Sequence, residues 1–350
     1  MKNRHIQLEK IKGSRFGDKL KTVLSITIWA NILKSKIFFT KSLNYHGAFT
    51  FSEKDLPINR YINKDGVDRS KTTIHNPLHV GSDFDGVSLD KIQKIRSAFN
   101  LGKWGGKDFD LIRFVARPRI HPHLLKQYEN EDPELKGVYE KSLNEFKELY
   151  WFNKPLQKNK DRINISVHIR RGDCTLREIY NGYDFKFYKK IINTINKTFS
   201  GKNFVINIFC ENLNCDDIIP LGKLPNTKLC IGKVLPDDFI KIPKTGLVNQ
   251  AFHALCCSDF LFANDSEFSI MSGYLSNGIT FYSSDLLPRS PPLMKDGAVV
   301  YDDKGQLITG EVGHGYELRF KKESDLNGVS DIVLFKDELD LEKKISQRIN

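Results

Sequence analysis

The chain has 350 residues, of which 40% are hydrophobic and 28% are charged. This balance is typical of a folded globular protein and excludes a disordered or fibrous chain. Lys and Arg outnumber Asp and Glu by 54 to 43, giving a formal net charge of +11, and 27 of the basic against 18 of the acidic residues lie in residues 1–150. Because this surplus is dispersed along the first half, it suits anionic small molecules, an acidic membrane surface or no specific partner better than nucleic acid.

Two further classes are excluded by the sequence. No stretch reaches the roughly 18 apolar residues that a membrane span needs. The best candidate, Thr22–Leu33, is too short, and no small-residue cleavage signal follows it, so we expect a cytoplasmic or peripherally membrane-bound protein. The six cysteines form no CxxC pair and have no histidine at zinc-ligand spacing, which predicts reduced, mostly buried thiols and no metal.

In the first half, a glycine-containing turn precedes an apolar helix expected at 20–33 and a short strand at 37–39. Residues 44–110 are expected to form loops and short helices, and 121–147 a long helix. The polar segment 155–161 is typical of a linker. It predicts a first α/β domain at 1–155, a second domain at 160–335 and a C-terminal helix within 336–350.

The second half alternates between strand and helix patterns. Such alternation predicts a parallel, Rossmann-like sheet with helical crossovers and therefore an α/β fold. Ligands of such sheets bind beyond the carboxyl ends of the strands. The expected strands are 163–169, 204–209, 229–234, 260–263 and 279–282, and the expected helices are 185–199, 246–257 and 268–276.

A pair of arginines follows the first of these strands, in the run His168-Ile169-Arg170-Arg171-Gly172-Asp173. Arginine presents a planar fork of donors that matches phosphate oxygens and keeps its charge. At a strand's carboxyl end, Arg170 can neutralise a pyrophosphate without a metal, while Arg171 can hold a second phosphate or Asp173. A solvated surface pair is the structural alternative.

Three other loops carry candidate ligand contacts. Ser266 opens the helix after the strand at 260–263, where a serine either caps the helix or presents it to a phosphate. Glu211 follows the strand at 204–209 as a candidate contact for a nucleoside, and surface polarity explains it equally well. Gly13 and Gly17 precede the apolar helix and allow close backbone approach to a ligand.

Taken in order, these loops resemble those of the fucosyltransferase superfamily, and most closely its α1,6-fucosyltransferase-like family, which includes bacterial nodulation enzymes. The family hallmark H-x-R-R-x-D is complete here as His168, Arg170, Arg171 and Asp173, and Glu178 stands where animal members carry a catalytic glutamate. The similarity spans about residues 11–40 and 110–283.

The resemblance implies a GT-B-like fold whose first domain binds the acceptor and whose second binds the nucleotide sugar. It implies an inverting transfer of fucose from GDP-fucose to a glycan hydroxyl, including α1,6 linkage to GlcNAc, with no metal or other cofactor. The catalytic residues would be Arg170, Glu178 and Asp173. Arg170 would stabilise the leaving diphosphate, Glu178 would act as general base, and Arg171 would hold the second phosphate or Asp173. The remaining donor contacts would be His168, Arg171, Glu211, Ser266, Gly13 and Gly17.

The sequence departs from the family at several points. Asn212 replaces a second acidic residue, and Ala251 stands where an aspartate is expected. Neither the SH3-like module nor the membrane anchor of the Golgi-resident animal members is recognisable. Two alternatives therefore stay open: a glycosyltransferase of the same fold with another nucleotide sugar, and a non-catalytic module that binds glycans or anions.

Overall fold

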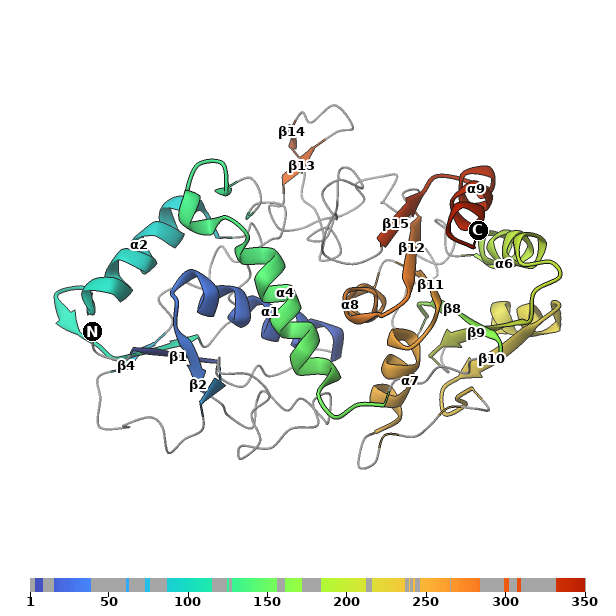
Figure 1. Cartoon of the computed structure of the whole chain (residues 1–350), viewed down its shortest axis with the longest axis horizontal. Coiled ribbons are helices and arrows are strands. Elements are labelled where there is room, and N and C mark those ends of the chain that lie inside the picture. The colour runs from blue at the N-terminus through green and yellow to red at the C-terminus, as the bar shows by residue number, and fades with distance from the viewer. Residues whose placement is uncertain are drawn as a thin grey trace. The chain divides into compact units, whose positions relative to one another are not determined.

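The structure, a computed structural model, divides into two compact units, which are described separately (Figure 1). The first unit comprises Met1–Lys154 and Pro291–Lys321, and the second comprises Pro155–Ser290 and Lys322–Asn350. The residues that the structure describes are 4–8, 16–38, 61–62, 73–75, 87–114, 125, 128–155, 161–171, 184–211, 216–236, 239, 242, 246–264, 266–283, 299–301, 307–309 and 332–349.

The first unit contains a five-stranded sheet in the order β3-β2-β1-β7-β4, in which every described pairing is parallel. Its strands are β1 (His5–Leu8), β2 (Lys36–Phe38), β3 (Tyr61–Ile62), β4 (Thr73–His75) and β7 (Leu111–Phe114). Two small antiparallel pairs are formed by β5 (Lys103–Trp104) with β6 (Lys107–Asp108) and by β13 (Val299–Tyr301) with β14 (Leu307–Thr309). An α/β first half is thus confirmed.

Helix α1 (Phe16–Ile32) is the apolar helix that the sequence predicts, and it begins four residues earlier than expected. Trp29 of α1 is fully buried and stacks on Phe114 of β7, with ring centroids 5.5 Å apart. Near the end of α1, Asn31 donates to Ser142 Oγ at 3.0 Å and to Glu145 Oε2 at 3.1 Å. Both acceptors lie on α4 (Val138–Trp151), so polar contacts as well as apolar ones join the two helices.

The prediction of loops and short helices over 44–110 is wrong at α2 (Leu89–Leu101), a helix of 13 residues. Ile92, Ile95 and Phe99 lie three and four positions apart and are buried, which is the spacing of one helical face. Ser88 caps the first turn, and Gly102 ends the helix at a φ of 72°. The expected helix over 121–147 is likewise interrupted, because Gly137 adopts a φ of 71° immediately before α4.

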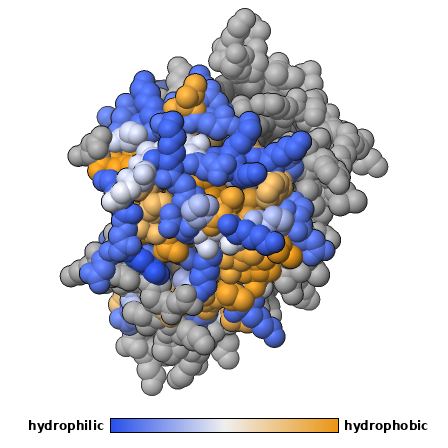
Figure 2. All heavy atoms as spheres, turned by 90° about the vertical axis from the view of Figure 1, so that its right-hand side faces the viewer, coloured by the Kyte–Doolittle hydropathy of each residue, from blue (hydrophilic) through white to orange (hydrophobic). Residues whose placement is uncertain are grey.

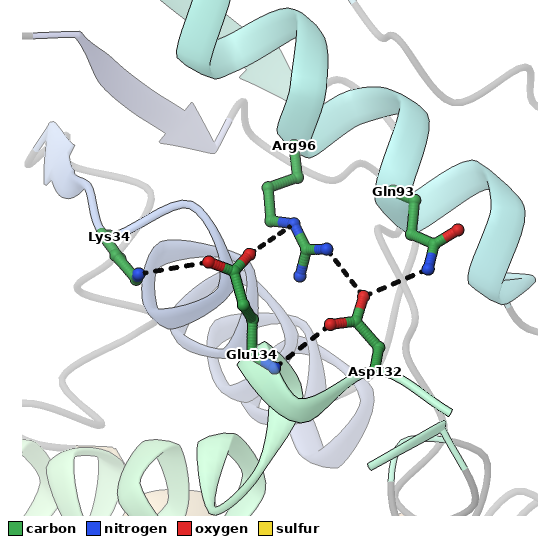
Figure 3. A network of polar contacts seen from close by, with 5 residues as sticks. All are labelled: Lys34, Gln93, Arg96, Asp132 and Glu134. Atoms are coloured by element: carbon green, nitrogen blue, oxygen red, sulfur yellow. Dashed lines mark hydrogen bonds and ion pairs between the residues drawn. The ribbon is translucent and has the colours of Figure 1, made fainter. Parts of the chain in front are cut away.

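A polar network holds α2 to the short helix η3 (Pro133–Leu135) within the first unit (Figure 3). Arg96 donates to Asp132 at 2.7 Å and lies 3.1 Å from Glu134. Gln93 adds a hydrogen bond to Asp132 at 3.2 Å, and Lys34 approaches Glu134 at 3.7 Å. The Arg96 and Asp132 side chains are largely shielded from water while Lys34 is exposed, so the inner pair contributes most of the stabilisation.

The second unit contains a six-stranded sheet in the order β10-β9-β8-β11-β12-β15, again with every pairing parallel. Its strands are β8 (Ile163–Ile169), β9 (Phe204–Cys210), β10 (Thr227–Ile231), β11 (Phe260–Ala263), β12 (Ile279–Ser283) and β15 (Ile332–Phe335). The predicted strands β8, β9, β11 and β12 are confirmed to within a residue. β10 ends three residues early because Gly232 turns the chain at a φ of 62°.

Helices cover both faces of this sheet. α6 (Phe185–Thr198) and α9 (Glu338–Ile349) pack on one face, while α7 (Leu247–Cys256) and α8 (Glu267–Leu275) pack on the other. Successive side chains along each strand point to opposite faces of the sheet, so each strand contributes to both layers. The first face buries Ile165, Val167 and Ile169 of β8 together with Ile191, Ile195, Leu341 and Ile345 from the helices.

The Rossmann-like parallel sheet predicted for the second half is therefore confirmed, and two α/β units in one chain are what a GT-B-like fold requires. The division into units differs from the predicted domains in two respects. Residues 291–321 group with the first unit, and α9 packs inside the second unit. No helix within the described ranges has both the length and the apolar character to cross a membrane. Four of the cysteines (210, 230, 256 and 257) are buried.

The described surface of the second unit mixes hydrophilic and hydrophobic residues (Figure 2). The large hydrophobic side chains exposed there are Ile219, Val234, Leu247, Val248 and Leu339.

Candidate functional site

The strand order of the second sheet reverses between β8 and β11. Counted along the unit, the order is third, second, first, fourth, fifth and sixth, which is that of a Rossmann fold. The chain leaves β8 toward β9 on one side, whereas β11 continues to β12 on the other, so the loops after β8 and β11 diverge. Ligands of doubly wound sheets bind beyond the carboxyl ends of the strands, at the point where the strand order reverses; this place is called the edge between β8 and β11. The arginine pair follows β8 and Ser266 follows β11, so the topology brings two predicted loops to one place.

Arg171 is completely buried and has a partner that the sequence analysis did not identify. Its Nε and Nη2 atoms donate to the two carboxylate oxygens of Asp217 at 3.2 and 2.7 Å. Its Nη1 atom donates to the backbone carbonyl of Arg170 at 2.9 Å. Burial alone would lower the pKa of Arg171, but the hydrogen bonds and charge of Asp217 outweigh it and raise the pKa above its usual value. Arg171 is therefore a buried, charged residue that connects Asp217 to the backbone of Arg170.

Arg170 is the first residue after β8 and is half-buried. Its positive charge acts on His168, whose pKa falls from 6.5 to about 4, mainly because the ring is buried and secondly because of Arg170. Asn264 opposes this shift. At neutral pH the imidazole is thus uncharged, and Arg170 supplies positive charge at this edge of the sheet.

His168 points to the face of the sheet that α8 covers, where its ring lies 5.4 Å from that of Phe268. Beside it, Asn264 is 1% exposed and donates to the hydroxyl of Tyr188 at 3.1 Å. His168 and Asn264 also interact with each other, since a side-chain hydrogen bond with Asn264 partly offsets the lowering of the His168 pKa.

Ser266 is the N-cap of α8 and is almost buried. Its hydroxyl accepts from the backbone N–H of Ser269 at 3.4 Å, and the Ser269 hydroxyl in turn accepts from the N–H of Asn264 at 3.0 Å. The capping interpretation of Ser266 is therefore confirmed. Because α8 follows β11, its N-terminus, the positive end of the helix dipole, lies at the edge between β8 and β11.

Glu211 follows β9 and is exposed. Because Ile169 pairs with Cys210, Glu211 and Arg170 are the next residues of neighbouring strands. The predicted contact residue therefore lies one strand away from the reversal of the strand order.

Gly17 lies in the first turn of α1 and is buried, so it belongs to the helix and not to the preceding loop. The loop itself follows β1, where the first sheet also changes direction, since β1 lies between β2 and β7. Gly13, Asp173 and Glu178 lie outside the described residues, so their predicted roles are untested. Within the described ranges, no group of three or more His, Cys, Asp or Glu side chains is placed to hold a metal ion.

Sequence reasoning missed Asp217 and Asn264. Asp217 lies in η4 (Asp216–Lys223), seven residues beyond the end of β9, and no spacing rule connects it to Arg171. Asn264 is the residue directly after β11, and its place at the end of a predicted strand is a signal that could have identified it.

No family model matches the chain, and no curated protein matches it. Among solved structures, the chain is similar to Arabidopsis thaliana FUT1 in complex with GDP, at a TM-score of 0.43 and 9% identity over 81% of this chain and 70% of that one. It is similar to POFUT1 in complex with GDP at a TM-score of 0.42 and 12% identity, over 80% of this chain and 98% of that one. For the E. coli heptosyltransferase WaaC with ADP-2-deoxy-2-fluoro heptose the values are 0.38 and 12%, over 99% of both chains. At these TM-scores and identities, the function of this chain has to rest on its own geometry.

Proposed function

We propose that this chain is a glycosyltransferase that binds a nucleotide sugar at the edge between β8 and β11, with GDP-fucose as donor. The observation that carries the proposal is the reversal of strand order with Arg170 immediately after β8. A doubly wound sheet binds nucleotides at such a point, and guanidinium groups match diphosphate oxygens. The choice of fucose comes from the resemblance of the H-x-R-R-x-D run.

Breakage of the bond between sugar and phosphate builds negative charge on the departing diphosphate. Arg170 is the side chain proposed to meet that charge, because it is the first residue after β8 and is only half-buried. The N-terminus of α8 would bind the diphosphate from the β11 side through backbone N–H groups. Neutral His168 and the amide of Asn264 are suited to uncharged polar groups of the nucleotide.

Inversion at the sugar requires the acceptor hydroxyl to attack from the side opposite the diphosphate. The resemblance assigns the general base to Glu178 and a supporting role to Asp173, and both assignments remain part of the proposal. Positive charge from Arg170 would take the place of a metal in stabilising the leaving group. A hydroxyl of a glycan, including α1,6 linkage to GlcNAc, is the proposed acceptor.

Nucleotide release from a panel of nucleotide sugars tests this proposal. The purified chain is incubated with a GlcNAc-bearing glycan as acceptor and with GDP-fucose, GDP-mannose, an ADP-linked heptose or a CMP-linked sialic acid, each with and without a chelator. Release from GDP-fucose alone, unchanged by the chelator, is the expected result. Release from another donor would support the alternative glycosyltransferase, and binding without release from any donor would support a non-catalytic module.

Arg170→Ala is expected to lower turnover about 10²–10³-fold, because one well-placed donor to the developing charge is lost. The unfolding midpoint should change little, since Arg170 follows the strand and is only half-buried. Lys223→Ala removes one exposed positive charge from the far end of η4 and should leave turnover unchanged. Turnover of the Arg170 variant within tenfold of wild type would contradict the assignment.

A further inference from the structure

We infer that Asp217 is a positioning residue for diphosphate binding, acting through Arg171 on the backbone of Arg170. This inference rests on the proposed function and extends it to a residue outside the arginine run. Asp217 receives two hydrogen bonds from Arg171, and Arg171 donates a third to the carbonyl of Arg170. The three residues thus form a continuous chain of contacts from η4 to the end of β8.

The burial of Arg171 explains why this chain of contacts is needed. A guanidinium with 0% exposed surface cannot be solvated by water, so its charge requires an anionic partner in the protein. The bidentate geometry also restrains the direction of the guanidinium plane. Since Nη1 of that plane donates to the carbonyl of Arg170, the orientation of the peptide after Arg170 depends on Asp217.

The two arginines therefore have different electrostatic roles. Asp217 compensates the charge of Arg171, whose pKa it raises, so this pair adds little net charge to the edge of the sheet. Arg170 carries the positive charge that the diphosphate meets, and the neutral pair beneath it determines where that charge lies. This arrangement differs from a site in which both arginines bind phosphate directly.

The test measures GDP affinity of the full chain by calorimetry for wild type and variants. Asp217→Asn keeps the shape of the side chain and removes its charge, and it is expected to weaken GDP binding about tenfold, the scale of one hydrogen bond to a charged group. Asp216→Asn, at the exposed neighbouring aspartate, is the matched control and should bind GDP as wild type does. In the Arg170→Ala background, Asp217→Asn should have no further effect, because the residue acts through Arg170.

A second variant keeps the test valid if Asp217→Asn folds poorly. Replacing both partners, Arg171→Met with Asp217→Leu, removes the buried charge together with its counter-charge, which proteins often tolerate without loss of stability. This double variant should fold and should show the same tenfold weakening.

Each outcome has a separate meaning. Wild-type affinity in both Asp217→Asn and the double variant would overturn the positioning role while leaving the proposed function intact. Tighter binding in Asp217→Asn would overturn it as well, because Arg171 would then be a phosphate ligand that Asp217 restrains. A wild-type chain that binds neither GDP nor another nucleoside diphosphate would overturn the proposed function and this inference together.

Discussion

At the scale of single residues, His168 and Arg171 lie three positions apart and are both buried, yet His168 is neutral and Arg171 is charged. His168 is shielded from water beside Arg170 and has no anionic partner among the described residues, so its pKa falls to about 4. Arg171 is buried more completely, but Asp217 raises its pKa. The site therefore combines the neutral imidazole of His168, the ion pair of Arg171 with Asp217 and the positive charge of Arg170.

The lowered pKa of His168 predicts a pH dependence of stability. Between 6.5 and about 4 the unfolded chain binds a proton on this residue and the folded chain does not, so the free energy of unfolding rises with pH in this window. On acidification from about pH 7 to about pH 4.5, His168 should account for a loss of about 2 kcal/mol. Denaturant titrations of wild type and His168→Phe at both pH values measure this difference. Equal losses in the two proteins would show that His168 titrates normally.

At the scale of elements, the start of α8 combines a structural and a proposed binding role. Ser266 accepts from the N–H of Ser269, as Ser88 accepts from the N–H of Lys91 at the start of α2. The two caps are chemically alike, but only that of α8 lies at the reversal of strand order in the second sheet. A difference between equal substitutions at the two caps would therefore report ligand binding and not helix stability.

Ser266→Asp is expected to keep the cap, since aspartate caps helices about as well as serine, and to change stability by less than about 0.5 kcal/mol. Its carboxylate would repel a diphosphate at the helix N-terminus, so GDP affinity should fall about tenfold or more. Ser88→Asp in the first unit should leave GDP affinity unchanged. Calorimetric binding and thermal unfolding of both variants distinguish the roles, and unchanged GDP affinity of Ser266→Asp would remove Ser266 from the donor site.

At the scale of the whole molecule, the C-terminal segment completes the second unit. β15 adds to β12 at the edge of the sheet, and α9 packs against the face that α6 covers. Lys197 of α6 and Glu342 of α9 form an ion pair at 2.8 Å at the border of this contact. The C-terminal helix is consequently a structural part of the nucleotide-binding unit proposed here.

Leu341→Ala is expected to destabilise the second unit by about 2–5 kcal/mol, because a fully buried side chain leaves a cavity. Leu339→Ala, two residues earlier on the same helix, is the control: that side chain is 77% exposed, and its loss should cost less than about 0.5 kcal/mol. Denaturant midpoints of the two variants measure the contrast. Similar midpoints would show that α9 does not belong to the core of the unit.

Sequence patterns predicted the second sheet well because its central strands have strong local signals. Ile163–Ile169 alternates between apolar and polar residues and Phe260–Ala263 is a short apolar run, and their limits agree with β8 and β11. β15 was missed although its four residues form an apolar run between Asp331 and Lys336, whereas α2 was missed because polar residues outnumber its three buried apolar positions. Arg170 and Ser266 were found from strand ends, which periodicity locates.

The amino-acid order by itself determined the α/β class, the succession of strands and helices in the second half, and the loops that hold arginine and serine, because these depend on neighbours within a few residues. Only the tertiary structure decided that β8 lies beside β11 and that Arg171 binds Asp217 across 46 positions. Those choices depend on burial and on contacts between distant segments, and local patterns carry no information about either.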